Sequence, residues 1–473
     1  MSAKTAQTGP RKNRGADTHA TRPAAAISPA RAAAFEILTL VAAGKGHSDD
    51  LLHSPHTARL SQEDRNLATA LVMGVLRWQI ALDARITKLL ARPEQPAQPV
   101  ALALRMGAFQ LLHMDRIPAH AVLNESVELC RTAGHPHAAG MVNAVLRKLV
   151  AQAQPGAQQA NRNLPLFEFP AAFAERLGHP LWLVERWTAT YGRKAALAIC
   201  EYGQHEPASG GLFPSTNAPS TDEADLLSRD TLASSSDSNP ALPQIDDGSR
   251  LVAELAAAAL PFTADRAPQV WDCCAAPGGK TLVLAERLQS SAILATDISA
   301  RRLARMAARV GSSQHGARIR CEVLDAATPA AEPNTAFDLI LCDVPCSGTG
   351  TLARNPEIRH QLRPEDLARH AQRQRAILAG ALRRLAPGGR LLYSTCSLEP
   401  EENEQVVNAV LAELPGMRRI SLEVAFGNLR ERGILSGGVV TDLIRTAIQD
   451  GALRILPGLH PCDGFFAALL ERV

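Results

Sequence analysis

The sequence predicts two structural domains of different class, an all-α domain followed by an α/β domain with a mostly parallel sheet. Residues 30–152 show apolar side chains at helical spacing, whereas from residue 250 onward short apolar runs alternate with amphipathic helical segments. The chain has 473 residues, of which 46% are hydrophobic, so each part is large enough to bury its own core.

Two helix-start signals support the all-α prediction for residues 30–152. Ser28 followed by Pro29 is a typical N-cap with proline at the first helical position. Ser61 gives a second N-cap signal before a long helix. Further amphipathic helices are expected near 98–114, 118–133 and 137–152.

The first 29 residues are expected to form a disordered basic tail. Their charged residues are Lys4, Arg11, Lys12, Arg14 and Arg22 against Asp17. A solvated tail is the simplest interpretation; an arm that touches RNA non-specifically and an organellar presequence are the alternatives. The net charge of +3 for the whole chain is too small to identify a nucleic-acid partner by itself.

Hydrophobicity and cysteine usage indicate a cytoplasmic protein. The sequence has no run of 18 or more apolar residues, and its first 30 residues lack the apolar block of a signal peptide, so no membrane span is expected. Its nine cysteines include no Cys-x-x-Cys pair, and no histidine pair with zinc-finger spacing accompanies them. We therefore expect reduced thiols and no metal site.

Residues 153–249 connect the two domains. A short helical region is expected to about residue 205, followed by a linker over 208–248 that is rich in Ser, Thr, Asp and Pro.

The pattern over 250–473 predicts a Rossmann-like domain in which helices cover both faces of the sheet. Strands are expected near 269–273, 292–296, 319–323, 337–341, 390–394 and 464–470, and helices near 279–289, 299–310 and 364–386. Ligands of such sheets bind at the carboxyl ends of the strands, so the residues that follow each strand are the candidate functional residues.

A glycine-containing loop follows the first of these strands. It comprises Cys274, Ala275, Ala276, Pro277, Gly278, Gly279 and Lys280. Its end, Gly-Gly-Lys-Thr, is similar to a nucleoside-triphosphate loop, but that motif needs glycine where Cys274 stands. Asp297 ends the second strand, where a ribose diol would be held, and Asp325 follows the third. The set favours an adenosine-bearing ligand, a structural tight turn being the alternative; without a full Gly-x-Gly-x-x-Gly, a nicotinamide dinucleotide is disfavoured.

Two cysteines are expected at the ends of neighbouring strands. Pro345 must stop the fourth strand, which leaves Asp343 and Cys346 at its carboxyl edge, and Cys396 ends the fifth strand. Each cysteine alone is more often a buried apolar residue, but two thiols at strand ends beside an aspartate favour catalysis if the strands are adjacent. A helix is expected directly after Cys396, and its N-terminus would lower the pKa of that thiol against the opposing charge of Glu401 and Glu402.

Four segments resemble the Sun (Fmu), or RsmB-like, family of 16S rRNA cytosine-C5 methyltransferases. They are 274–280, 343–350, 394–404 and 463–466, and residues 30–152 resemble the family's NusB-like RNA-binding domain through 121–126 and 141–147. The chain departs from the family at 208–248, where a family strand that contacts RNA is not recognisable.

The resemblance implies an S-adenosyl-L-methionine-dependent enzyme. Residues 274–280 with Asp297, Asp325 and Asp343 would surround this cofactor, Cys396 would be the nucleophile, and Cys346 would assist product release. Small-subunit ribosomal RNA would be the partner, and a monomer is expected. Alternatives are a non-catalytic RNA-binding assembly factor and carbon-5 methylation of a cytosine in another RNA such as tRNA. Arg354 and Arg359, which follow Cys346, would clamp phosphates or remain solvated at the rim.

Overall fold

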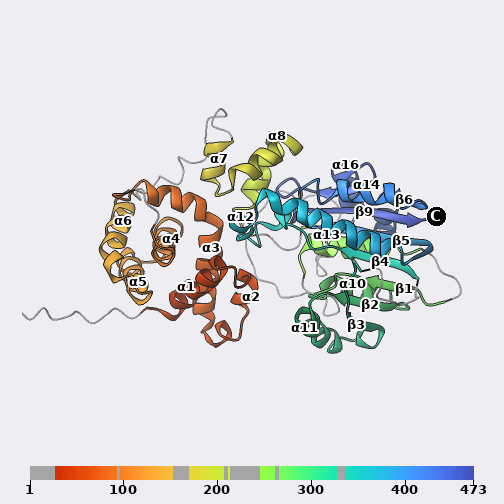
Figure 1. The fold of residues 1–473 in the computed structure, drawn as a ribbon, viewed down its shortest axis with the longest axis horizontal. Coiled ribbons are helices and arrows are strands. Elements are labelled where there is room, and N and C mark those ends of the chain that lie inside the picture. Colours follow the sequence, from red (N-terminus) through yellow and green to blue (C-terminus); the bar gives the residue numbers. More distant parts are fainter. Residues whose placement is uncertain are drawn as a thin grey trace, which may run out of the picture.

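The computed structural model describes residues 27–92, 96–152, 170–206, 211–213, 245–261, 266–328 and 336–473. Within them, a helical bundle and an α/β domain lie side by side, with α7 (Ala171–Arg176) and α8 (Leu181–Tyr202) beside their junction (Figure 1). The predicted fold class is therefore confirmed. The predicted basic tail lies outside the described residues up to residue 26, and so does the predicted linker, apart from 211–213 and 245–248.

The N-terminal bundle contains the five helices that the sequence predicts and one short helix, α2, that it does not. They are α1 (Pro29–Ala42), α2 (Ser48–Leu52), α3 (Gln62–Thr87), α4 (Gln98–His113), α5 (Ala119–Thr132) and α6 (Ala139–Gln152). Ser28 is the N-cap of α1, and the Ser61 hydroxyl accepts a hydrogen bond of 3.1 Å from the Asp64 amide at the start of α3. Both start signals are thus confirmed.

Among the described helices, α3 has the length and apolar composition to cross a bilayer. Its apolar residues Leu71, Val72 and Val75 are fully buried, however, and the helix packs between α1 and α4. It is the central helix of the bundle core.

The α/β domain contains one mixed sheet with the strand order β3-β2-β1-β4-β5-β9-β8-β7. Strand β6 also pairs with β9, along the same edge as β8 but at the other end of the strand. The strands are β1 (Gln269–Asp272), β2 (Ala292–Asp297), β3 (Ile319–Val323), β4 (Phe337–Asp343), β5 (Leu385–Thr395), β6 (Met417–Ile420), β7 (Ile448–Gln449), β8 (Ala452–Ile455) and β9 (Phe465–Arg472). Strands β1 to β5 are parallel, and β9 is antiparallel to β5. Strands β6 to β8 are not among the predicted strands, because they are too short to show a periodic pattern.

Helices cover both faces of this sheet, as the alternation of burial requires. On β4, Leu339 and Leu341 belong to one core and Ile340 and Cys342 to the other, because successive side chains point to opposite faces. The first core contains α9 (Asp247–Ala258), α10 (Gly279–Arg287), α11 (Ala300–Gly311), α15 (Glu423–Glu431) and α16 (Gly437–Ala447). The second contains α13 (Pro364–Leu382) and α14 (Glu404–Glu413).

A buried arginine joins the helical part of the chain to the α/β domain. Arg359, in α12 (Ile358–Gln361), is 3% exposed, and its guanidinium donates to the backbone carbonyls of Arg77 at 2.9 Å and Gly178 at 3.2 Å, and also to that of Gly203. Burial lowers its pKa to about 9. The hypothesis that Arg359 clamps RNA phosphates is therefore wrong, because its guanidinium binds backbone carbonyls inside the protein. Arg354 is partly exposed and forms an ion pair with Asp463 at 2.7 Å.

We expect Arg359→Met to lower the free energy of unfolding by about 3 kcal/mol, because several buried carbonyls lose their donor. Urea unfolding of the full chain measures this change. Arg432→Met, which removes an exposed guanidinium at the end of α15, is the matched control and should be neutral. Equal unfolding free energies for the two variants would show that Arg359 does not hold the domains together.

Candidate active site

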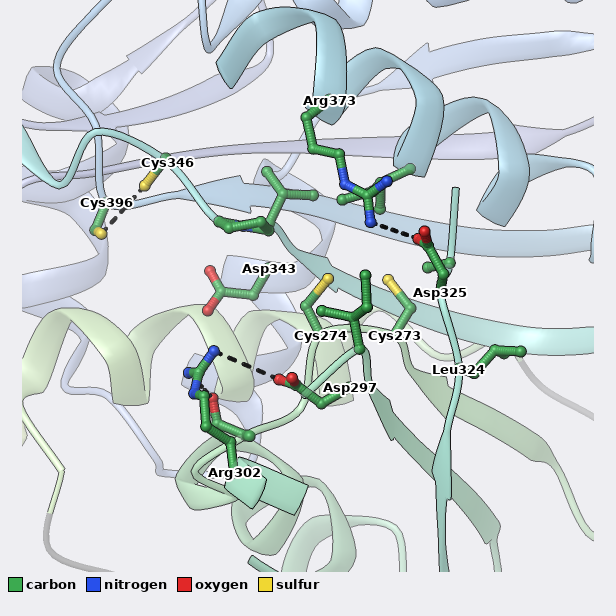
Figure 2. Close-up of a pocket in the computed structure, with 16 residues that line it drawn as sticks. Cys273, Cys274, Asp297, Arg302, Leu324, Asp325, Asp343, Cys346, Arg373 and Cys396 are labelled. Atoms are coloured by element: carbon green, nitrogen blue, oxygen red, sulfur yellow. Dashed lines mark hydrogen bonds and ion pairs between the residues drawn. The ribbon is translucent and has the colours of Figure 1, made fainter. Parts of the chain in front are cut away.

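The carboxyl ends of the five parallel strands share one edge of the sheet, and the residues predicted to be functional lie there. Strands β4 and β5 are adjacent, with Asp343 opposite Ser394 in the register. Cys346 and Cys396 therefore follow neighbouring strands, as the prediction of a shared catalytic site requires. A cavity of about 370 Å³ opens at this edge (Figure 2). Its lining includes Cys274, Ala276, Asp297, Asp325, Asp343, Cys346 and Cys396.

The glycine loop runs from the end of β1 into α10. Gly278 is the N-cap of α10 in a left-handed conformation with φ of 97°, and a Cβ there would come within 2.8 Å of the Met306 side chain. Both features require glycine. The amide of Ala275 donates to the carbonyl of Thr296 at 2.8 Å, which fixes the loop against the end of β2.

Two carboxylates line the cavity at the ends of β2 and β3. Asp297 is 4% exposed, accepts a hydrogen bond of 2.8 Å from the Ser299 amide and lies 3.6 Å from the Arg302 guanidinium. Asp325 accepts a hydrogen bond of 2.5 Å from Arg373 of α13 (Figure 2). Burial acts to raise the pKa of Asp325, but the bond to Arg373 lowers it overall, so this carboxyl is held ionised.

The two predicted thiols are in direct contact. Cys346 Sγ lies 3.3 Å from Cys396 Sγ, and both line the cavity (Figure 2). The hydrogen bond with Cys396, together with burial, raises the pKa of the Cys346 thiol well above its ordinary value, and the charge of Glu402 adds to the rise.

Backbone contacts of two glycines hold the Cys396 loop in place. The amide of Gly350 donates to the carbonyl of Cys396 at 2.9 Å, and the amide of Gly464 donates to the carbonyl of Gly350 at 2.8 Å. A Cβ on Gly350 would lie 2.3 Å from the Gly464 oxygen, so the close approach needs glycine. This contact explains why the Asp-Gly-Phe-Phe segment at 463–466 belongs to the site.

Asp343 forms an ion pair that the sequence did not reveal. Its carboxylate accepts a hydrogen bond of 2.7 Å from the Ser394 hydroxyl and lies 2.8 Å from the Lys280 ammonium, which also contacts the Ser249 hydroxyl at 3.2 Å. Burial acts to lower the pKa of Lys280, but the charge of Asp343, followed by those of Asp246 and Cys396, raises it above its ordinary value. Lys280 is therefore a fixed positive charge beside the thiols.

Lys280 lines a second cavity, of about 380 Å³, which Asp343 lines as well. Pro277 and Gly279 line it as well, and Cys274, Ala276 and Asp343 are shared by both cavities. Of the residues predicted to surround the cofactor, all except Gly278 line one or both of these cavities.

Glu399, Glu401 and Glu402 lie in the loop and turn that follow Cys396, and α14 begins only at Glu404. The prediction that a helix starts directly after Cys396 is therefore wrong. Glu399 and Glu401 both pair with Arg186 of α8, at 2.9 and 2.7 Å, and Glu404 pairs with Arg454. These carboxylates are neutralised by arginines from other parts of the chain.

Comparison with known proteins identifies the family. Residues 260–471 match the model described as 16S rRNA methyltransferase RsmB/F, and residues 28–151 match the NusB family. The probable ribosomal RNA small subunit methyltransferase B of Bacillus subtilis (strain 168) is 30% identical over 468 residues, which cover 93% of this chain and 98% of that protein. The chain belongs to the RsmB/F family of 16S rRNA methyltransferases.

Another similar protein is the ribosomal RNA small subunit methyltransferase B of Xanthomonas campestris pv. campestris, which is 33% identical over 431 residues, or 86% of this chain and 89% of that protein. The crystal structure of PH0851 has the same fold, with a TM-score of 0.65 and 22% identity over 95% of this chain and 100% of that one.

RsmB/F enzymes are S-adenosylmethionine-dependent, and the cavity beside the thiols suits this cofactor. Asp297 and Asp325 are the residues that would hold the hydroxyl and amino groups of an adenosine through their carboxylate oxygens. Ile298, which is 61% exposed, and Leu324 add an apolar wall that an adenine ring would cover.

Proposed function

We propose that this RsmB/F methyltransferase methylates carbon 5 of a cytosine in 16S rRNA, through a covalent bond between Cys396 and the base. The observation that carries the proposal is the pair of thiols. They contact each other at 3.3 Å, at the ends of adjacent strands, and both face the cavity that suits the methyl donor.

A thiolate is needed because carbon 5 of cytosine is a weak nucleophile. Addition of the Cys396 sulfur to carbon 6 breaks the double bond between carbons 5 and 6 and places an electron pair on carbon 5. S-adenosylmethionine supplies an electrophilic methyl group for that carbon. Burial acts to lower the pKa of Lys280, but Asp343, then Asp246 and Cys396, raise it, so this ammonium lies where it would stabilise the Cys396 thiolate.

We assign the removal of the carbon-5 proton to Cys346. Once the Cys396 sulfur is bonded to carbon 6 its negative charge no longer opposes ionisation of Cys346, so Cys346 releases its own proton to water and, as a thiolate, takes the carbon-5 proton. The electron pair of that C–H bond restores the double bond, and the Cys396 sulfur leaves carbon 6. Contact between the two sulfurs places this base beside the bond that must break. Asp343 would accept a hydrogen bond from the cytosine amino group and hold the ring between the thiols and Lys280.

The base must leave its stack to be reached on both faces, so the substrate would be a single-stranded, looped or flipped region of rRNA that is not yet fully assembled. We propose that residues 30–152 contribute RNA contacts, that residues 250–473 form the catalytic domain, and that a monomer acts in the cytoplasm.

The test is methylation of an unmodified 16S rRNA transcript with labelled S-adenosylmethionine, followed by digestion to nucleosides. We expect the label in 5-methylcytidine. Label in a different nucleoside would overturn the proposed chemistry while leaving the family assignment in place.

We expect Asp297→Ala to weaken the binding of S-adenosylmethionine by about 10- to 100-fold, because a buried carboxylate that pairs with ligand hydroxyls contributes one to two strong hydrogen bonds. Isothermal calorimetry measures the affinity. Asp442→Ala, which removes an exposed carboxylate on α16, is the control and should bind normally. Unchanged affinity of the Asp297 variant would remove this residue from the cofactor site.

A further inference from the structure

One acidic residue after Cys396 is bound differently from its neighbours. Within residues 399–404, all of which the structure describes, Glu399, Glu401 and Glu404 have arginine partners, whereas Glu402 has no basic group within ion-pair distance among the described residues. Its side chain is 0% exposed. A buried carboxylate without a counter-ion is costly unless hydrogen bonds replace its water, so its retention calls for a specific role.

Glu402 is held by donors from three segments. One carboxylate oxygen accepts from the Ser347 amide at 2.9 Å and from Gln374 of α13 at 2.9 Å. The other oxygen accepts from the Ser397 hydroxyl at 2.5 Å and from the Ser347 hydroxyl. Ser347 follows Cys346 and Ser397 follows Cys396, so one carboxylate bridges the two loops that carry the thiols. Gln374 also donates to the carbonyl of Pro345 at 3.0 Å, which braces the first loop from the other side.

We infer that Glu402 is a positioning residue that holds the two thiols in contact and, by its charge, keeps the proton on Cys346 while Cys396 becomes the nucleophile. The inference rests on the proposed covalent mechanism, since it explains how two touching thiols take different roles. The sequence predicted that the charge of Glu402 would act on Cys396; in this inference it acts on Cys346.

The charges around Cys346 agree with this division. The titratable groups around it are Tyr393 of β5, Cys396 directly after β5 and Glu402 itself, and Asp343 of β4 and Arg373 of α13 line the same cavity. The guanidinium of Arg373 is already paired with Asp325. After the hydrogen bond with Cys396, burial and the Cys396 charge, Glu402 further raises the pKa of Cys346. Removing its charge must therefore lower that pKa, and Cys346 would ionise at a lower pH.

Glu402→Gln tests the inference, because an amide keeps the shape and can still accept from the Ser347 amide and Gln374 while losing the charge. Alkylation of Cys346 by iodoacetamide, followed by peptide mass spectrometry over about pH 6 to 10, reports its ionisation. The measurement uses full-length protein in a Cys396→Ser background, so that only one of the two thiols reacts. We expect Glu402→Gln to move the midpoint down by about one pH unit.

Glu401→Gln is the matched control, because its carboxylate lies one residue away and faces Arg186; the midpoint should not move. An unchanged midpoint in Glu402→Gln would overturn the inference. If Glu402→Gln no longer binds S-adenosylmethionine, Ser347→Ala provides the test: it removes a hydroxyl donor and leaves the charge, so the midpoint should stay high, and a fall would overturn the inference.

Turnover gives a second readout in the otherwise intact enzyme. We expect Glu402→Gln to lower kcat about tenfold with little change in KM for either substrate. The variant disturbs the contact between the two thiols and the proton on Cys346, whereas the surfaces that bind the substrates are retained. Equal loss in Glu401→Gln would contradict a specific role. The alkylation measurement needs no methyl transfer, so failure of the inference and failure of the proposed reaction are distinguishable.

Discussion

Replacement of Cys396 by alanine is expected to abolish methyl transfer to unmodified 16S rRNA, with a loss of at least about 10³-fold in kcat/KM. Without the Cys396 sulfur, the thiol assigned to attack carbon 6 is lost, and carbon 5 stays too electron-poor to accept a methyl group. Transfer of label from S-adenosylmethionine to an rRNA transcript measures the effect. Binding of S-adenosylmethionine should be retained, because Asp297 and Asp325 are untouched.

Cys321→Ala is the control for this experiment. Its thiol is half-buried on β3 and lines neither cavity, so activity should remain near that of the unaltered protein. Substantial transfer by Cys396→Ala would exclude Cys396 as the nucleophile.

Replacement of Cys346 by alanine is expected to stop the reaction one step later. Cys396 can still attack and the base can still be methylated, but the proton on carbon 5 has no thiol to receive it. A covalent protein–RNA complex should therefore accumulate, visible as a slowly migrating band on a denaturing gel that requires both rRNA and S-adenosylmethionine. Turnover should fall by about 10²-fold or more.

The double variant Cys346→Ala with Cys396→Ala should show no such band, because the attacking sulfur is gone. Normal turnover by Cys346→Ala, with no trapped complex, would contradict the assignment of Cys346 to product release.

The sequence was sufficient where structure depends on local patterns. The helix start after Ser28 follows from proline at the first helical position, and the start after Ser61 follows from side-chain capping. The strands that carry Asp297 and Asp343 follow from apolar runs ended by polar or proline residues. Placing both cysteines at strand ends was enough to predict a shared site, but their contact required β4 and β5 to be neighbours.

What could not be predicted depends on contacts between distant segments. Arg359 follows the site in sequence and is similar to a rim arginine, yet it is buried against carbonyls of residues 77, 178 and 203. The charges of Glu399 and Glu401 are neutralised by Arg186, more than 200 residues earlier. Glu402 became interpretable once its donors Ser347 and Gln374 were placed. Long-range pairing of this kind leaves no periodic signal in the sequence.

Identification of the cross-linked peptide in the Cys346→Ala complex tests the covalent mechanism most directly. Digestion of the trapped complex with protease and nuclease, followed by tandem mass spectrometry, locates both ends of the bond. We predict a peptide in which Cys396 is joined to a cytidine that carries one additional methyl group. A bond to any other residue, or methylated rRNA without a covalent complex, would contradict nucleophilic attack by Cys396.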